Sequence, residues 1–100
     1  MSLPTDHSKI ADQLTFNFHS DPGHGWLAVK KSLIRELGII SKISTYSYMK
    51  GQTAYLEEDC DASVFIDTFK EKFGIEPKIK DLEPREHTPI RSMDQFWMEA

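Results

Sequence analysis

Two glycine–isoleucine pairs, Gly38-Ile39 and Gly74-Ile75, constrain the fold of this chain most strongly. A glycine that follows helical spacing takes the left-handed conformation that ends a helix, and the apolar residue after it folds back. Each pair therefore predicts the end of a helix, and each helix follows a predicted hairpin. The matching residues leave open whether the two halves are a duplication or a common local solution.

The first hairpin-plus-helix unit is predicted from a change of apolar spacing. Apolar and polar residues alternate over residues 14–19, which is typical of a half-buried strand. An Asp-Pro-Gly turn lies within the loop 20–25, and the apolar residues 26–29 predict the second strand. Residues 30–37 then change to the spacing of a helix.

The second unit repeats this order and continues into a further strand. Residues 43–48 and 53–58 predict a hairpin, and Asp61 is placed to cap a helix over residues 62–73. Phenylalanines at every fourth position of that helix form one stripe for the core. Residues 75–82 predict a last strand, which Pro77 marks as an edge or irregular strand.

The order ββαββαβ predicts an α+β fold, with a mostly antiparallel sheet of about five strands and two helices on one face. Residues 1–13 are interpreted as a flexible arm, residues 14–83 as a single domain and residues 84–100 as a separate segment. Four apolar residues of that segment fit one stripe of a short helix, which we expect to pack on the same domain or on a second copy in a homodimer: Ile90, Met93, Phe96 and Trp97.

Composition excludes several classes of protein. One cysteine among 100 residues cannot form an internal disulfide, and no apolar run approaches the length of a membrane span. The start of the sequence lacks the apolar stretch of a secretory signal, so a cytoplasmic location is expected. A net charge of −4 argues against a general nucleic-acid binder, although four lysines allow a local basic face: Lys70, Lys72, Lys78 and Lys80.

The first cluster that can carry chemistry lies in the predicted turn after the first strand. His19, Asp21 and His24 have the atoms for a divalent metal, but their number and spacing do not match a standard zinc site, and no metal is assigned. Gly23 and Gly25 leave backbone amides free for an anion or ligand, with Trp26 beside them. A purely structural turn is the third interpretation.

The second cluster places four carboxylates and one thiol in five residues, Glu57 to Asp61. The amides of the following helix favour this negative charge, so a solvated helix start is one interpretation. Strand alternation sends Glu57 and Asp59 to one side and Glu58 to the other, and such a pair can also hold a metal or act in acid–base catalysis. The flanking carboxylates disfavour the thiolate of Cys60, so we assign no catalytic residue.

Four segments of the sequence resemble a known family. They are Asp21–Leu27 (DPGHGWL), Ile43–Tyr48 (ISTYSY), Tyr55–Asp61 (YLEEDCD) and Pro89–Arg91 (PIR). This pattern is similar to a family of short, uncharacterised bacterial and phage- or plasmid-borne proteins, over about residues 15–96. The resemblance implies a prokaryotic or viral setting and draws attention to both clusters, but it implies no activity.

Two functional hypotheses follow. The first is a non-enzymatic binding or accessory module, without a cofactor, whose ligand is a small molecule or an unidentified protein held near His19, His24 and Trp26. The second is a small metal-dependent enzyme, such as a hydrolase, that combines the histidine loop with the acidic cluster. Convergence of the two clusters around a cleft favours the enzyme, and their separation disfavours it.

Overall fold

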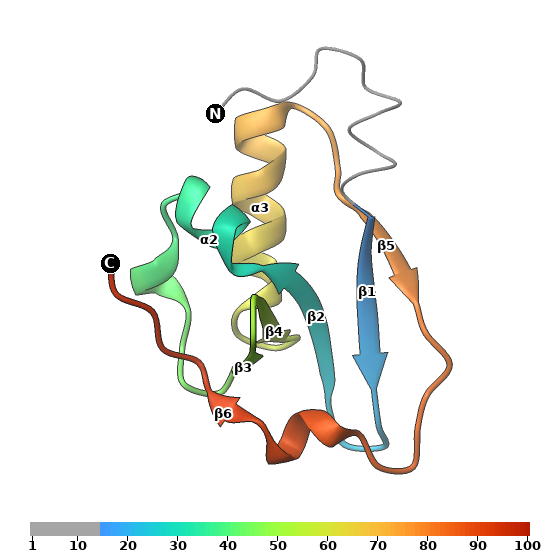
Figure 1. Ribbon diagram of the computed structural model, residues 1–100. Coiled ribbons are helices and arrows are strands. Elements are labelled where there is room, and N and C mark those ends of the chain that lie inside the picture. The colour runs from blue at the N-terminus through green and yellow to red at the C-terminus, as the bar shows by residue number, and fades with distance from the viewer. Residues whose placement is uncertain (1–14) are drawn as a thin grey trace.

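The computed structural model describes residues 15–100 of the chain (Figure 1), and the predicted arm and Leu14 lie outside this range. Its elements are, in order, β1 (Thr15–Ser20), β2 (Gly25–Lys30), α2 (Lys31–Glu36), the 3-10 turn η1 (Ile40–Lys42), β3 (Tyr48–Lys50), β4 (Thr53–Glu57), α3 (Ala62–Phe73), β5 (Lys78–Asp81), the 3-10 turn η2 (Pro89–Ser92) and β6 (Asp94–Gln95).

The described strands form one six-stranded sheet in the order β5-β1-β2-β4-β3-β6. Neighbouring strands are antiparallel except for β5, which runs parallel to β1. The predicted hairpin is confirmed, because Tyr48 pairs with Tyr55 across β3 and β4. The predicted α+β class is confirmed as well, with one strand more than expected, and β5 is an edge strand as Pro77 indicated.

Both helices pack on one face of the sheet. The side chains that point from the strands to this face form one buried cluster with those of α2 and α3. Phe16 touches Phe65 and Phe69 edge to face, at ring-centroid distances of 5.0 and 5.8 Å. Neither helix in residues 15–100 is long and apolar enough to cross a membrane. Neither α2 nor α3 covers the opposite face of the sheet, which carries the site described below (Figure 1).

The predicted strand over residues 43–48 is wrong for all but its last residue. Ile40–Lys42 is a 3-10 turn, and β3 begins only at Tyr48. Asp61 causes the difference, because its carboxylate accepts hydrogen bonds from the backbone N–H of Ser44 and from the hydroxyls of Ser44 and Ser47. These bonds curl the segment around the start of α3 and prevent it from pairing as a strand.

The role predicted for the Asp61 side chain is therefore also wrong. Asp61 occupies the N-cap position of α3, and its carbonyl accepts a hydrogen bond from the N–H of Phe65. Its carboxylate makes no capping hydrogen bond, because it binds the two serines instead. The cap position was recognisable from the sequence, but its long-range partners were not.

The C-terminal segment packs on the same domain without forming the predicted short helix. Residues 89–92 form η2, and β6 then pairs with β3. The N–H of Phe96 donates to the carbonyl of Ser47 at 2.8 Å, which brings the Phe96 ring into the core. Ile90 and Phe96 are buried, whereas Trp97 is 69% exposed. A homodimer contact through Trp97 stays a prediction.

Phe96 and Trp97 allow a direct comparison of adjacent aromatic residues. We expect Phe96→Ala to lower the free energy of unfolding by about 3 kcal/mol, because it opens a cavity in the core. Trp97→Ala is expected to change it by less than about 0.5 kcal/mol in the monomer. Urea unfolding of both variants measures the difference, and equal losses would show that the segment is packed differently.

Candidate functional site

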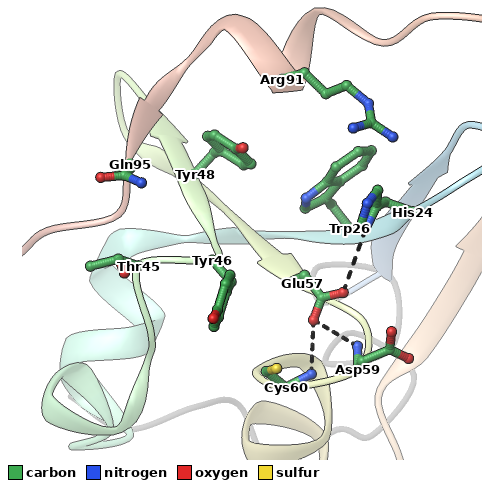
Figure 2. A pocket seen from close by; sticks show the side chains of 10 residues that line it. All are labelled: His24, Trp26, Thr45, Tyr46, Tyr48, Glu57, Asp59, Cys60, Arg91 and Gln95. Atoms are coloured by element: carbon green, nitrogen blue, oxygen red, sulfur yellow. Dashed lines mark hydrogen bonds and ion pairs between the residues drawn. The ribbon is translucent and has the colours of Figure 1, made fainter.

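A pocket of about 310 Å³ opens on the face of the sheet opposite α2 and α3 (Figure 2). Trp26 on β2 and Glu57 on β4 are directly paired across the two strands, so their side chains lie on the same face. Both are buried, with 2% and 7% of their surface exposed. Within residues 15–100 the lining comes from four separate parts of the chain: His24, Trp26, Thr45, Tyr46, Tyr48, Glu57, Asp59, Cys60, Arg91 and Gln95.

Asp21 holds one wall of this pocket in place. Its Oδ1 accepts hydrogen bonds from the backbone N–H groups of Gly23 and His24, each at 3.1 Å, which closes the loop between β1 and β2. The same carboxylate accepts two hydrogen bonds from Arg91, from Nε at 2.6 Å and from Nη2 at 2.8 Å. Asp21 therefore links this loop to η2, far along the chain.

Arg91 carries this link onto the aromatic floor of the pocket. Its guanidinium lies over the Trp26 ring, with Cζ 5.5 Å from the ring centroid, which is a cation–π distance. The Arg91 side chain is half exposed, whereas only 2% of the Asp21 side chain is exposed. The hydrogen bonds from Arg91 hold the pKa of Asp21 well below its usual range, and Asp21 raises that of Arg91 in turn.

This lowered pKa predicts how stability depends on pH. Asp21 binds protons more weakly in the folded than in the unfolded chain, so its contribution is present at neutral pH and is lost as the pH falls below about 4. We expect Asp21→Asn to be less stable than the wild type at neutral pH and the difference to shrink in acid. Denaturant unfolding at several pH values measures this, with the exposed Asp94→Asn as the control. A difference independent of pH would contradict the assignment.

Glu57 holds the opposite wall. Its Oε2 accepts hydrogen bonds from the backbone N–H groups of Asp59 and Cys60, both at 2.9 Å, and so fixes the turn before α3. Its Oε1 lies 4.0 Å from Nδ1 of His24, which is longer than a hydrogen bond (Figure 2). One carboxylate oxygen therefore builds the turn, and the other faces the pocket side of the sheet.

Ser47 connects the two carboxylates to the aromatic lining. It is fully buried, accepts a hydrogen bond from the N–H of Glu57 and donates its own hydroxyl to Asp61. These bonds fix the segment that carries Tyr46 and Tyr48. The Tyr48 ring stands edge-on to Trp26, with 6.3 Å between the ring centroids, and Tyr46 is 71% exposed at the rim.

The indole nitrogen of Trp26 is the unusual atom of the site. It is buried, and no hydrogen-bond acceptor meets it within residues 15–100. Figure 2 shows this nitrogen turned toward the space between Tyr48 and Glu57. A buried donor without a partner costs free energy, so a group that accepts this hydrogen bond would be bound favourably.

The structure brings together five of the residues singled out from the sequence. His24 and Trp26 of the first cluster meet Glu57, Asp59 and Cys60 of the second around one pocket. The two clusters therefore converge. Glu58 lies in a different pocket from its two neighbours, as predicted, but β4 ends at Glu57, so a turn and not strand alternation places Asp59.

The other candidates of the histidine loop lie outside the pocket. His19 contacts Tyr55 and lines a separate hollow with Arg85, and burial followed by the Arg85 charge lowers its pKa. Gly25 is needed for packing, because a Cβ there would collide with the Phe18 ring. At Gly23 a Cβ would lie 3.3 Å from the Arg91 guanidinium, which is a crowded contact. Packing therefore explains the presence of glycine at both positions.

Two chemical functions find little support in this geometry. Residues 15–100 contain no group of three or more histidine, cysteine or carboxylate side chains placed to hold a metal ion. The carboxylate of Asp21 is already taken up by Arg91 and two amides. Desolvation and the neighbouring Glu57 raise the pKa of the Cys60 thiol, which makes it a weak nucleophile at neutral pH.

Sequence reasoning missed five lining residues: Thr45, Tyr46, Tyr48, Arg91 and Gln95. A signal for four of them was present, because they belong to the segments ISTYSY and PIR that the sequence analysis had singled out. Gln95 is brought to the pocket by the short strand β6. A comparison of the chain with protein-family models, characterised proteins and solved structures found no match.

Proposed function

We propose that this protein is a non-enzymatic binding module whose ligand occupies the Trp26–Glu57 pocket. The observation that carries the proposal is the buried indole N–H of Trp26, which meets no acceptor in the described part of the chain and is turned toward the space between Tyr48 and Glu57. Beside it lies a buried carboxylate with one oxygen free of amide donors. A largely preformed cleft with a few convergent polar groups on an aromatic floor is typical of a ligand site.

The hydrogen-bond network around the pocket supports binding as its purpose. Asp21 with Arg91 fixes one wall, and Glu57, Ser47 and Asp61 fix the other. Walls held in this way lose little conformational freedom when a ligand enters, which increases affinity. The residues left at the rim, Tyr46 and Asp59, are exposed and available for contact.

The setting of the module is part of the proposal. The resemblance of its four segments to short bacterial and phage- or plasmid-borne proteins suggests an accessory protein of a bacterium or mobile element. We propose that it acts in the cytoplasm. The convergence of the two clusters keeps a metal-dependent hydrolase as the competing hypothesis.

Metal analysis separates these hypotheses. We expect the purified protein to hold far less than one transition metal per chain, because Asp21 is engaged and His19 lies apart from the pocket. Elemental analysis of the native protein measures this. A content of about one zinc, nickel or manganese per chain, lost in a His19→Ala, His24→Ala double variant, would contradict the binding module and favour the enzyme.

Trp26 itself can report binding. The chain has two tryptophans, so a Trp97→Phe variant leaves Trp26 as the single source of tryptophan fluorescence. We expect a saturable change with at least one compound from a panel of N-acetylated amino-acid amides and nucleosides. The same titration of a Trp97→Phe, Tyr46→Ala variant should show weaker binding at unchanged stability, because Tyr46 is exposed. No saturable change with any compound would contradict the proposal.

A further inference from the structure

We propose that the ligand of this pocket is an arginine side chain in a peptide segment of a partner protein. This inference rests on the proposed function and adds the chemistry of the ligand. Three properties of the pocket select it: its negative charge, its aromatic rings and the Trp26 indole N–H, which meets no acceptor among residues 15–100. They disfavour, in turn, anions, compact ammonium groups and ligands without a hydrogen-bond acceptor.

The charge of the lining favours a cation. Glu57 and Asp59 contribute two carboxylates, and within residues 15–100 Arg91 is the one lysine or arginine that lines the pocket. The guanidinium of Arg91 is already bound through two hydrogen bonds to Asp21, so its charge is balanced outside the pocket. The lining therefore repels anions and attracts a positive group that donates hydrogen bonds to Oε1 of Glu57, the oxygen that the two amides leave unused and that faces His24 at 4.0 Å.

The aromatic rings favour a planar cation over a compact ammonium group. Tyr46 and Tyr48 flank the space in front of Glu57 (Figure 2), and the Tyr46 ring is mostly exposed. A guanidinium stacks on such rings and still presents its N–H groups in the plane to a carboxylate. Arg91 over Trp26 already makes this contact from the other side of the site.

The indole N–H of Trp26 requires an acceptor on the same ligand. A guanidinium or an ammonium ion has only donors, so a simple amine leaves Trp26 unpaired. A peptide carbonyl next to an arginine side chain supplies the acceptor within one residue. A guanine base also combines donors with an acceptor, but the phosphates of a nucleic acid would meet two carboxylates and a chain of net charge −4.

The inference is tested with N-acetyl-arginine amide, titrated into the Trp97→Phe protein at pH about 8, where an ordinary histidine is neutral. N-acetyl-citrulline amide has the same shape without the charge, and we expect it to bind at least about tenfold more weakly. Free arginine tests whether the ligand is an arginine residue within a peptide. We expect free arginine to bind more weakly than the blocked amide, because the pocket repels its α-carboxylate. Guanosine tests whether a guanine base is the ligand instead.

Two charge-removing variants provide the matched control. Asp59→Asn removes a carboxylate at the rim, and we expect affinity for N-acetyl-arginine amide to fall about threefold to tenfold. Glu58→Gln removes the neighbouring charge, which lies in another pocket, and should change affinity less than about twofold. Citrulline binding equal to arginine, or equal effects of the two variants, would overturn the inference.

The outcomes separate this inference from the proposed function. Tighter binding of guanosine than of N-acetyl-arginine amide would overturn the arginine ligand and leave the binding module intact. Saturable binding of a neutral amide, without binding of N-acetyl-arginine amide, would also overturn the arginine ligand and leave the binding module intact. The absence of binding by every compound would overturn both. Equal affinity for free arginine and its blocked amide would overturn the peptide source.

Discussion

Replacing Phe69 with alanine is expected to lower the free energy of unfolding by about 3–5 kcal/mol. Phe69 is 1% exposed and lies between Phe16, Phe65 and Phe73, so its loss leaves a cavity that the rings around it cannot fill. A domain of this size has a total stability of about 5–15 kcal/mol, so the loss is a large fraction of it.

Urea unfolding followed by circular dichroism measures this loss. Phe73→Ala is the graded control, because Phe73 belongs to the same stripe but is only partly buried at the end of α3. Its effect should be clearly smaller. A Phe69→Ala protein that unfolds at the same urea concentration as the wild type would show that the helix does not pack through this face.

Asp61→Asn is expected to cost about 3 kcal/mol, although it changes few atoms. The Oδ2 atom of Asp61 accepts three hydrogen bonds, from the Ser44 amide and the two serine hydroxyls, and only 2% of the residue is exposed. An amide group offers one acceptor oxygen without a charge, so it weakens all three bonds or leaves donors unpaired.

The matched control for Asp61→Asn is Asp67→Asn, which makes the same change on the exposed side of α3. We expect no more than about 0.5 kcal/mol there. Both variants are compared by denaturant unfolding at neutral pH. Equal effects would mean that the link from Asp61 to Ser44 and Ser47 does not hold the segment that carries the tyrosines.

The elements with a clear apolar period were predictable from the sequence. The helix over residues 62–73 matches α3 residue for residue, and the β3–β4 hairpin is present. The spacing of apolar residues determines these elements, and the left-handed conformation of Gly74 ends α3. Interactions between residues close in the sequence are therefore sufficient to predict them.

The predictions were wrong for segments whose hydrogen-bond partners lie far along the chain. Residues 43–47 have the composition of a strand, but Asp61 takes their donors. The C-terminal segment has the spacing of a short helix, but β3 offers it a free edge and Ser47 an acceptor for Phe96. No short-range pattern contains these bonds, so the tertiary contact overrides the local preference.

The two residue clusters of the candidate site were predictable from the sequence, but the distant residues that complete the pocket were not. Glycine, histidine and carboxylate motifs drew attention to residues 19–26 and 57–61, and the structure joins them through the β2–β4 pairing of Trp26 with Glu57. The role of Asp21 required Arg91, which lies 70 residues away. The metal interpretation arose because a sequence does not reveal that a carboxylate is already occupied.

The most direct test of the Trp26–Glu57 pocket is the pair of tryptophan indole resonances in a ¹H–¹⁵N spectrum. Trp97 is exposed and does not belong to the pocket lining, so it serves as an internal control. On titration with N-acetylated amino-acid amides and nucleosides, the account predicts that the Trp26 indole signal moves saturably while that of Trp97 stays in place. Shifts confined to Trp97 or to other faces, with the Trp26 signal unchanged, would contradict it.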